Sequence, residues 1–137
     1  METLYIGVDL GGTNLRCAVM RDDYTIISRI ECPTNAADGP NAVIDRIAGG
    51  ITAALRDAGC ENDSITAAGI GVPGPISQQQ GLVYTAPNMP DWHNVPLGEI
   101  VGKRTGIPTF IENDANCAGW GEYVAGAVGV ILDEGGN

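Results

Sequence analysis

Positive charge is scarce in this chain of 137 residues: seven Lys and Arg face seventeen Asp and Glu, which gives a formal net charge of −10. Nucleic acid and anionic membranes would repel such a surface, so we expect neither as a partner. Histidine is almost lacking, because His93 is the single one, and a histidine-based metal or proton-relay site would have no second member. No apolar run is long enough to cross a membrane, and no secretory or lipidation signal is visible.

Cysteines are few and widely spaced: Cys17, Cys32, Cys60 and Cys117. None forms a Cys-x-x-Cys pair, so the sequence favours neither a zinc ribbon nor a disulfide framework. We interpret them as small apolar fillers or free thiols of a cytoplasmic protein.

A glycine turn between two apolar runs is the first feature that suggests chemistry. Asp9-Leu10-Gly11-Gly12-Thr13-Asn14 connects predicted strands at residues 4–10 and 15–20. Adjacent glycines let backbone N–H groups approach an anion, Thr13 and Asn14 add donors, and Asp9 can hold a hydrated cation. Because the chain returns as a strand, the turn is neither a Walker loop nor a dinucleotide fingerprint, which both enter a helix. An ordinary glycine hairpin with an acid at its edge is the alternative.

An acid at a predicted strand-to-helix junction is the second feature. The apolar strand at 109–112 is followed by Asn113-Asp114-Ala115-Asn116, which opens a predicted helix rich in small residues. A carboxylate in this position can accept the proton of a hydroxyl group that attacks a phosphoryl group. The alternative is an N-cap that accepts hydrogen bonds from the first helical turn, and the two roles are compatible.

Four motifs, taken in order, resemble the ROK family of sugar kinases and repressors, a branch of the hexokinase–actin–Hsp70 superfamily. They are Asp9-Leu10-Gly11-Gly12-Thr13-Asn14, Gly69-Ile70-Gly71-Val72-Pro73-Gly74-Pro75, Ala86-Pro87-Asn88-Met89-Pro90-Asp91-Trp92 and Glu112-Asn113-Asp114-Ala115-Asn116. The resemblance covers roughly Leu4 to Gly126 and implies an ATP-dependent hexose kinase of glucokinase type, with glucose as the expected sugar and Mg²⁺ as the cofactor. A non-catalytic sugar- or phosphate-binding or assembly module and the remnant of a ROK regulator remain the alternatives.

The resemblance also implies roles for single residues on the sugar side. Asp114 would be the catalytic base that accepts the proton of a sugar hydroxyl, at O6. Asn88 and Asn113 would bind sugar hydroxyls, because an amide both donates and accepts. Gly71 and Pro73 would shape the loop beneath the sugar, although a simple strand-ending turn explains them equally well.

On the phosphate side the resemblance implies a second set of residues, with Asp9 holding Mg²⁺ through water. The set for ATP is Asp9, Gly11, Gly12, Thr13, Asn14 and Arg16. The alternative for Arg16 is that it points outward from its strand and its guanidinium is solvated, with no role in binding.

The order of elements predicts the fold class. We expect strands at 4–10, 15–20, 25–31, 66–72 and 109–112, and helices at 40–58, 97–105 and 115–124. Gly59 should end the first helix, and residues 78–80 should form a turn with at most a short strand at 82–84 after it. This order fits an α/β domain of the ribonuclease-H-like type (the actin/hexokinase ATPase superfamily), a mixed sheet of about five strands with helices on the faces. Gly49 and Gly50 should weaken the first helix unless close packing on the sheet requires bare backbone there.

Length sets the expected domain organisation. Residues 1–126 are expected to form the N-terminal ATPase-like domain, and 127–137 an atypical tail from a truncation or a frameshift, with the second kinase domain absent. We therefore expect the chain alone to be inactive and to self-associate through apolar surface that the missing part would cover.

Overall fold

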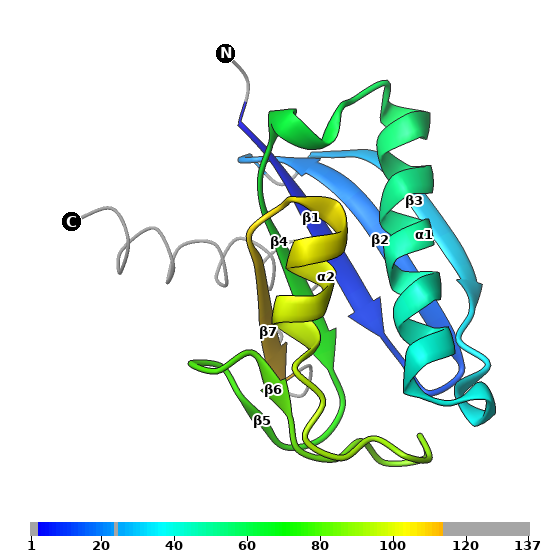
Figure 1. The fold of residues 1–137 in the computed structure, drawn as a ribbon. Helices are drawn as coiled ribbons and strands as arrows, with labels where there is room; N and C mark the ends of the chain where they lie inside the picture. The colour runs from blue at the N-terminus through cyan, green and yellow to red at the C-terminus, as the bar shows by residue number, and fades with distance from the viewer. Residues whose placement is uncertain (1–2, 24, 114–137) are drawn as a thin grey trace.

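The computed structural model describes residues 3–23 and 25–113 (Figure 1). Its centre is a five-stranded sheet in the order β3-β2-β1-β4-β7. The strands are β1 (Leu4–Leu10), β2 (Asn14–Arg21), β3 (Ile26–Pro33), β4 (Ile65–Val72) and β7 (Thr109–Asn113). β1, β2 and β3 pair antiparallel, whereas β4 pairs parallel with both β1 and β7. The predicted α/β class and mixed sheet are confirmed. β1 has the predicted bounds, and the ends of the other strands differ from the prediction by at most two residues.

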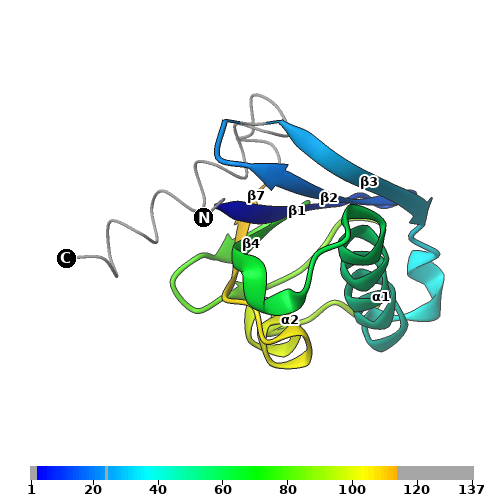
Figure 2. The same ribbon diagram turned by 90° about the horizontal axis from the view of Figure 1, so that it is seen from above.

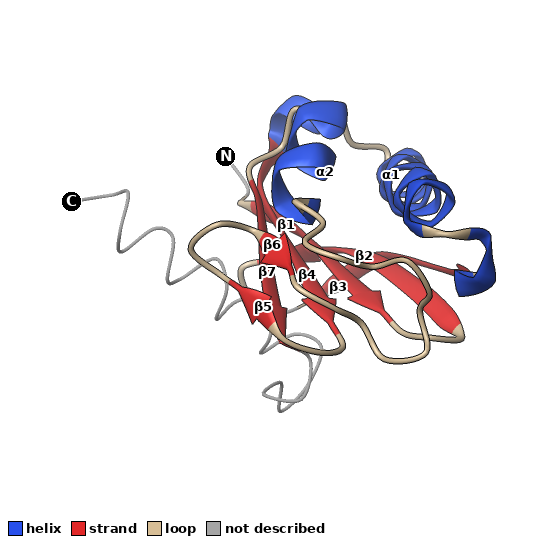
Figure 3. Ribbon diagram, turned by 60° about the horizontal axis from the view of Figure 1, so that its bottom comes forward, coloured by secondary structure: helices blue, strands red, loops and turns tan. Residues whose placement is uncertain are grey.

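Two helices cover one face of this sheet, α1 (Pro40–Ala58) and α2 (Leu97–Thr105) (Figures 2 and 3). Both helices have the predicted bounds. The apolar residues of α1 recur every three or four positions and are buried against the sheet, as amphipathic periodicity requires. Gly59 ends α1 in the left-handed conformation, with φ 70°, and its N–H caps the carbonyl of Arg56. The helix predicted at 115–124 lies outside the described residues.

The two faces of the sheet carry different clusters. Ile6, Val8 and Leu10 belong to the main core beneath the helices, whereas Tyr5, two residues before Gly7, belongs to a smaller cluster on the opposite face. Because side chains alternate along a strand, Asp9 falls on the same face as Tyr5. The acid at the end of β1 is thus directed away from the helix-covered core.

A small hairpin between β4 and α2 was only partly predicted. β5 (Ile76–Ser77) pairs antiparallel with β6 (Leu82–Val83), and Val83 bridges to Val95. The sequence predicted a turn at Gln78–Gln80 and at most one short strand after it, because two-residue strands carry no measurable periodicity. Short 3₁₀ turns, η1 (Ala36–Asp38) and η2 (Asn62–Ser64), were also missed. Within the described residues no helix is both long and apolar enough to cross a membrane.

The close approach of α1 to β2 explains one glycine of the Gly49-Gly50 pair. A Cβ on Gly50 would lie 2.8 Å from Sγ of Cys17, while a Cβ on Gly49 would meet nothing within 4 Å. Burial raises the pKa of Cys17 to about 12, with a smaller contribution from Cys32, so its thiol stays protonated at neutral pH and packs as an apolar group. Gly50 therefore belongs to the helix–sheet contact, and Gly49 does not.

We predict opposite effects for the two glycines. Gly50→Ala should lower the free energy of unfolding by about 1–3 kcal/mol through overpacking against Cys17. Gly49→Ala should raise it by up to about 1 kcal/mol through helix propensity. Urea unfolding of both variants, and of Gly50→Ala combined with Cys17→Ala, measures the coupling. If Cys17→Ala does not reduce the cost of Gly50→Ala, the contact is not the cause.

Candidate functional site

Three parallel strands end at one edge of the sheet and bring the predicted motifs together. Asp9 of β1 stands opposite Gly71 of β4, and Val72 of β4 stands opposite Asn113 of β7. Adjacent strands lie about 4.8 Å apart, so the hairpin after β1, the loop after β4 and the end of β7 are neighbours. We call this region the carboxyl edge. Ligand sites in open α/β sheets occur at such edges.

The turn between β1 and β2 is held tightly at its base and is open at its tip. The N–H of Gly11 donates to the carbonyl of Asn14 at 3.0 Å, and a Cβ on Gly11 would lie 2.9 Å from the same oxygen. A Cβ on Gly12 would meet nothing within 4 Å, and Gly12, Thr13 and Asn14 are all exposed. Three of the predicted phosphate-binding residues are therefore open to solvent at the tip of the turn.

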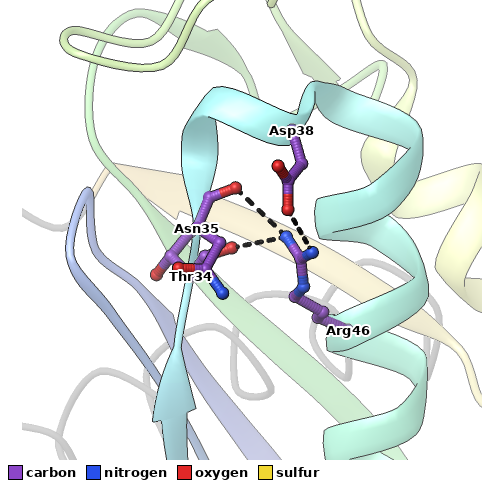
Figure 4. A network of polar contacts seen from close by, with 4 residues as sticks. All are labelled: Thr34, Asn35, Asp38 and Arg46. Atoms are coloured by element: carbon purple, nitrogen blue, oxygen red, sulfur yellow. Dashed lines mark hydrogen bonds and ion pairs between the residues drawn. The ribbon is translucent and has the colours of Figure 1, made fainter.

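The turn also rests on a segment that the sequence did not predict. Thr34, directly after β3, donates its backbone N–H to the carbonyl of Thr13 at 2.9 Å and its hydroxyl to the carbonyl of Gly11 at 2.7 Å. Arg46 of α1 donates in turn to the carbonyls of Thr34 and Asn35 and pairs with Asp38 (Figure 4). These partners lie 8 to 23 positions apart in the chain, so no local spacing pattern could reveal them.

Asp9 and Arg16 form an ion pair across β1 and β2, where the register places them opposite each other. Their side chains are 23% and 48% exposed, respectively, so the pair is weak and a ligand can exchange for either partner. Within residues 3–23 and 25–113 no group of three His, Cys, Asp or Glu could enclose a metal ion. One partly exposed carboxylate fits Mg²⁺ held mainly by water and phosphate oxygens, the mode that this ion prefers.

The loop after β4 is fastened to the end of β7 and to the segment that contains Asn88. Nδ2 of Asn113 donates to the carbonyl of Gly74 at 2.6 Å. Gly74 has φ 95°, and a Cβ there would lie 2.6 Å from the carbonyl of Thr85, so no other residue fits without strain. Asn88, three positions after Thr85, is exposed and has φ 62°, which asparagine tolerates. Asn113 and the segment 85–87, which directly precedes Asn88, therefore meet at Gly74.

Several residues near this loop have packing roles. Trp92 is 1% exposed and belongs to the main core, so it packs the long loop against the domain. Its Nε1 has no hydrogen-bond partner among the described residues. Glu112 accepts hydrogen bonds from Nε2 of Gln78 and from the N–H of Asn113. His93 is exposed.

Asp114, the predicted base, lies outside the described residues, as do Cys117 and the predicted tail at 127–137. The structure describes the chain up to its neighbour Asn113, which ends β7 at the carboxyl edge. Cys17, Cys32 and Cys60 are free thiols.

Comparison with known proteins identifies close relatives of this chain. The ROK family model matches residues 5–131. The glucokinase of Streptomyces coelicolor is 43% identical over 123 residues, which make up 90% of this chain and 36% of that protein. A putative xylose repressor from Caldicellulosiruptor sp. is 30% identical over 128 residues, 93% of this chain and 32% of the repressor.

Among solved structures, a ROK family glucokinase from Streptomyces griseus in complex with glucose and AMPPNP has a TM-score of 0.75 and 34% identity. The match covers 92% of this chain and 37% of that one. The chain therefore spans about a third of the length of the relatives that it matches. The likeness confirms the predicted ribonuclease-H-like fold class.

We predict that the two turn glycines differ in their contribution to stability. Gly11→Ala should lower the free energy of unfolding by about 1–3 kcal/mol, because its Cβ would press on the Asn14 carbonyl. Gly12→Ala, the matched control, should change it by no more than about 0.5 kcal/mol. Urea denaturation compares the two, and equal losses would show that the turn is not as tight as the structure has it.

Proposed function

The chain belongs to the ROK family, and from this premise we propose that it is the N-terminal domain of an ATP-dependent hexose kinase of glucokinase type. The reaction transfers the γ-phosphate of ATP to a hydroxyl of a hexose, O6 of glucose being the expected acceptor. Support comes from the identity with the Streptomyces coelicolor glucokinase and from the fold shared with a glucokinase that holds glucose and AMPPNP.

The observation that carries the proposal is the convergence at the carboxyl edge. The exposed glycine turn after β1 lies beside the loop after β4 and the end of β7, where amide side chains are found. The pairing of Asp9 with Gly71 and of Val72 with Asn113 sets this arrangement. Phosphoryl transfer to a sugar needs these two kinds of group side by side, since one holds the phosphates and the other holds the hydroxyls.

On the phosphate side, the turn supplies neutral donors. Gly11 and Gly12 let the backbone come close to the γ-phosphate, and Thr13 and Asn14 add side-chain donors to the charge that develops during transfer. The ion pair between Arg16 and Asp9 weakens when ligands bind, because Arg16 would then contact the phosphate and Asp9 would hold hydrated Mg²⁺. The ion, when bound with ATP, neutralises phosphate charge, which matters in a chain of net charge −10.

On the sugar side, Asp114 accepts the proton of the attacking hydroxyl. Asn113 and Asn88 hydrogen-bond other hydroxyls, and the backbone of Gly71 and Pro73 shapes the floor of the site. The bond from Asn113 to the Gly74 carbonyl fixes the orientation of its amide. A fixed amide holds the sugar hydroxyls that it binds in a defined position.

In this proposal the chain supplies part of each half of the site. Residues 1–126 form the first domain, and a second domain supplies the rest of the sugar shell and the adenine pocket. The chain alone therefore binds phosphate and sugar weakly, has little or no turnover, and self-associates through apolar surface that the second domain covers. The three free thiols fit a cytoplasmic protein.

A regulatory role is the second candidate, and the similarity to a putative xylose repressor favours it. A regulator needs to bind sugar but does not need a base. Turnover that depends on Asp114 separates the two candidates.

The test joins residues 1–126 to the part of Streptomyces coelicolor glucokinase that follows its matching segment, and measures glucose-dependent ADP release with Mg-ATP. We predict an active chimera. Asp114→Asn should lower kcat by about 10²–10⁴-fold with a small change in KM, because asparagine keeps the shape but cannot accept the proton.

Asp57→Asn is the control for this assay, since Asp57 is an exposed acid in the last turn of α1. The C-terminal end of this helix lies away from the strand ends of the carboxyl edge (Figure 1). It should leave kcat unchanged. An active chimera in which Asp114→Asn behaves like Asp57→Asn would contradict the assignment of the base. The 137-residue chain by itself should release no more ADP than its own Asp114→Asn variant, with size-exclusion chromatography reporting its self-association.

A further inference from the structure

We propose that Thr34, held by Arg46, is the positioning residue of the Gly11–Asn14 turn. It fixes the direction of the backbone N–H groups that receive a phosphate. The inference rests on the proposed phosphate-binding role of that turn, but it concerns two residues that lie outside all four sequence motifs.

Thr34 forms two hydrogen bonds to the turn, and it is the donor in both. Its backbone N–H reaches the carbonyl of Thr13 at 2.9 Å, and its hydroxyl reaches the carbonyl of Gly11 at 2.7 Å. The residue is 0% exposed, so water cannot replace the hydroxyl if the side chain is shortened or made apolar. Both bonds therefore belong to the resting structure of the turn.

Peptide planarity converts these two contacts into a direction for the turn's donors. In a trans peptide the C=O of one residue and the N–H of the next point to opposite sides. Because the Gly11 carbonyl is turned toward Thr34, the N–H of Gly12 points away from Thr34. The N–H of Asn14 points away for the same reason, since the Thr13 carbonyl is also turned toward Thr34. The amides of Gly12 and Asn14, on either side of Thr13, therefore both point away from Thr34, and backbone amides held in fixed directions in a turn can receive an anion.

Arg46 holds Thr34 in turn. Its Nη1 donates to the carbonyl of Thr34 at 2.8 Å and to that of Asn35 at 3.1 Å, and its Nη2 pairs with Asp38 (Figure 4). Asn35 has φ 49°, a conformation that most residues avoid, so the chain after β3 needs support to keep this path. The guanidinium of Arg46 contacts three acceptors, and Arg46 thereby links α1 to the segment that holds the turn.

The experiment compares Thr34→Val with Thr34→Ser in the 137-residue chain. Valine keeps the shape and the backbone N–H but removes the hydroxyl, whereas serine keeps the hydroxyl. ¹⁵N relaxation gives the order parameters of the Gly12 and Asn14 amides, and titration with inorganic tripolyphosphate gives the affinity of the turn for phosphate. Both are measured where every variant is folded.

For Thr34→Val we expect the order parameters of these amides to fall from about 0.85 to below about 0.6, and the affinity for tripolyphosphate to fall about tenfold. Thr34→Ser should keep both near the wild-type values. Arg46→Met should act like Thr34→Val and Arg46→Lys should recover part of the loss. Arg104→Met is the matched control, because Arg104 of α2 pairs with Asp45 of α1, the helix that carries Arg46, and no contact with the turn is seen among the described residues.

The two readouts separate this inference from the proposed function. If Thr34→Val and Arg46→Met change the order parameters of Gly12 and Asn14 no more than Arg104→Met does, the positioning role is wrong. This conclusion holds whatever the chain binds. If the order parameters fall as expected but the wild-type chain shows no affinity for tripolyphosphate, Thr34 positions the turn and the phosphate role of the turn is the part that fails.

Discussion

The parallel pairing of β4 with β1 and β7 is the constraint on which the rest of the structure depends. It places three strand ends at one edge, with Asp9 opposite Gly71 and Val72 opposite Asn113. A shift of one residue would turn Asp9 into the apolar core and Val8 out of it, because side chains alternate along a strand. The same burial that stabilises Val8 and Ile70 beneath the helices therefore also sets the position of the polar edge.

The phosphate site that we propose would have to rely on local donors, because the chain is acidic. The net charge of −10 repels an anion at long range, and the cation nearest the turn in sequence, Arg16, is paired with Asp9. What remains is the direction of backbone N–H groups, which costs no net charge and is set by where the carbonyls of the turn are held. The affinity of such a site depends on the rigidity of the turn, and the supports behind the turn matter as much as the donors at its surface.

Much of this arrangement could be predicted from the sequence, because its signals are local. Strand alternation, the periodicity of α1 and the glycine that ends it gave the element order and the bounds of both helices, and the four motifs gave the family. Contacts between residues far apart in the sequence could not be predicted. Examples are the hydrogen bonds from Thr34 to Gly11 and from Asn113 to Gly74. The different surroundings of Gly49 and Gly50 could not be predicted either, because Cys17 on β2 sets them. The small β5–β6 hairpin was predicted only in part for a different reason, since strands of two residues have no period to detect.

The most direct test of the account is a map of amide chemical shifts in this chain during titration with Mg-AMPPNP and then with glucose. We predict that the nucleotide changes the amide chemical shifts of Gly11, Gly12, Thr13 and Asn14. Glucose should change those of Gly71, Asn88 and Asn113. The C-terminal end of α1 should not respond to either ligand. Shifts confined to that end, or none at the carboxyl edge at saturating ligand, would contradict the claim that this edge is the phosphate and sugar site.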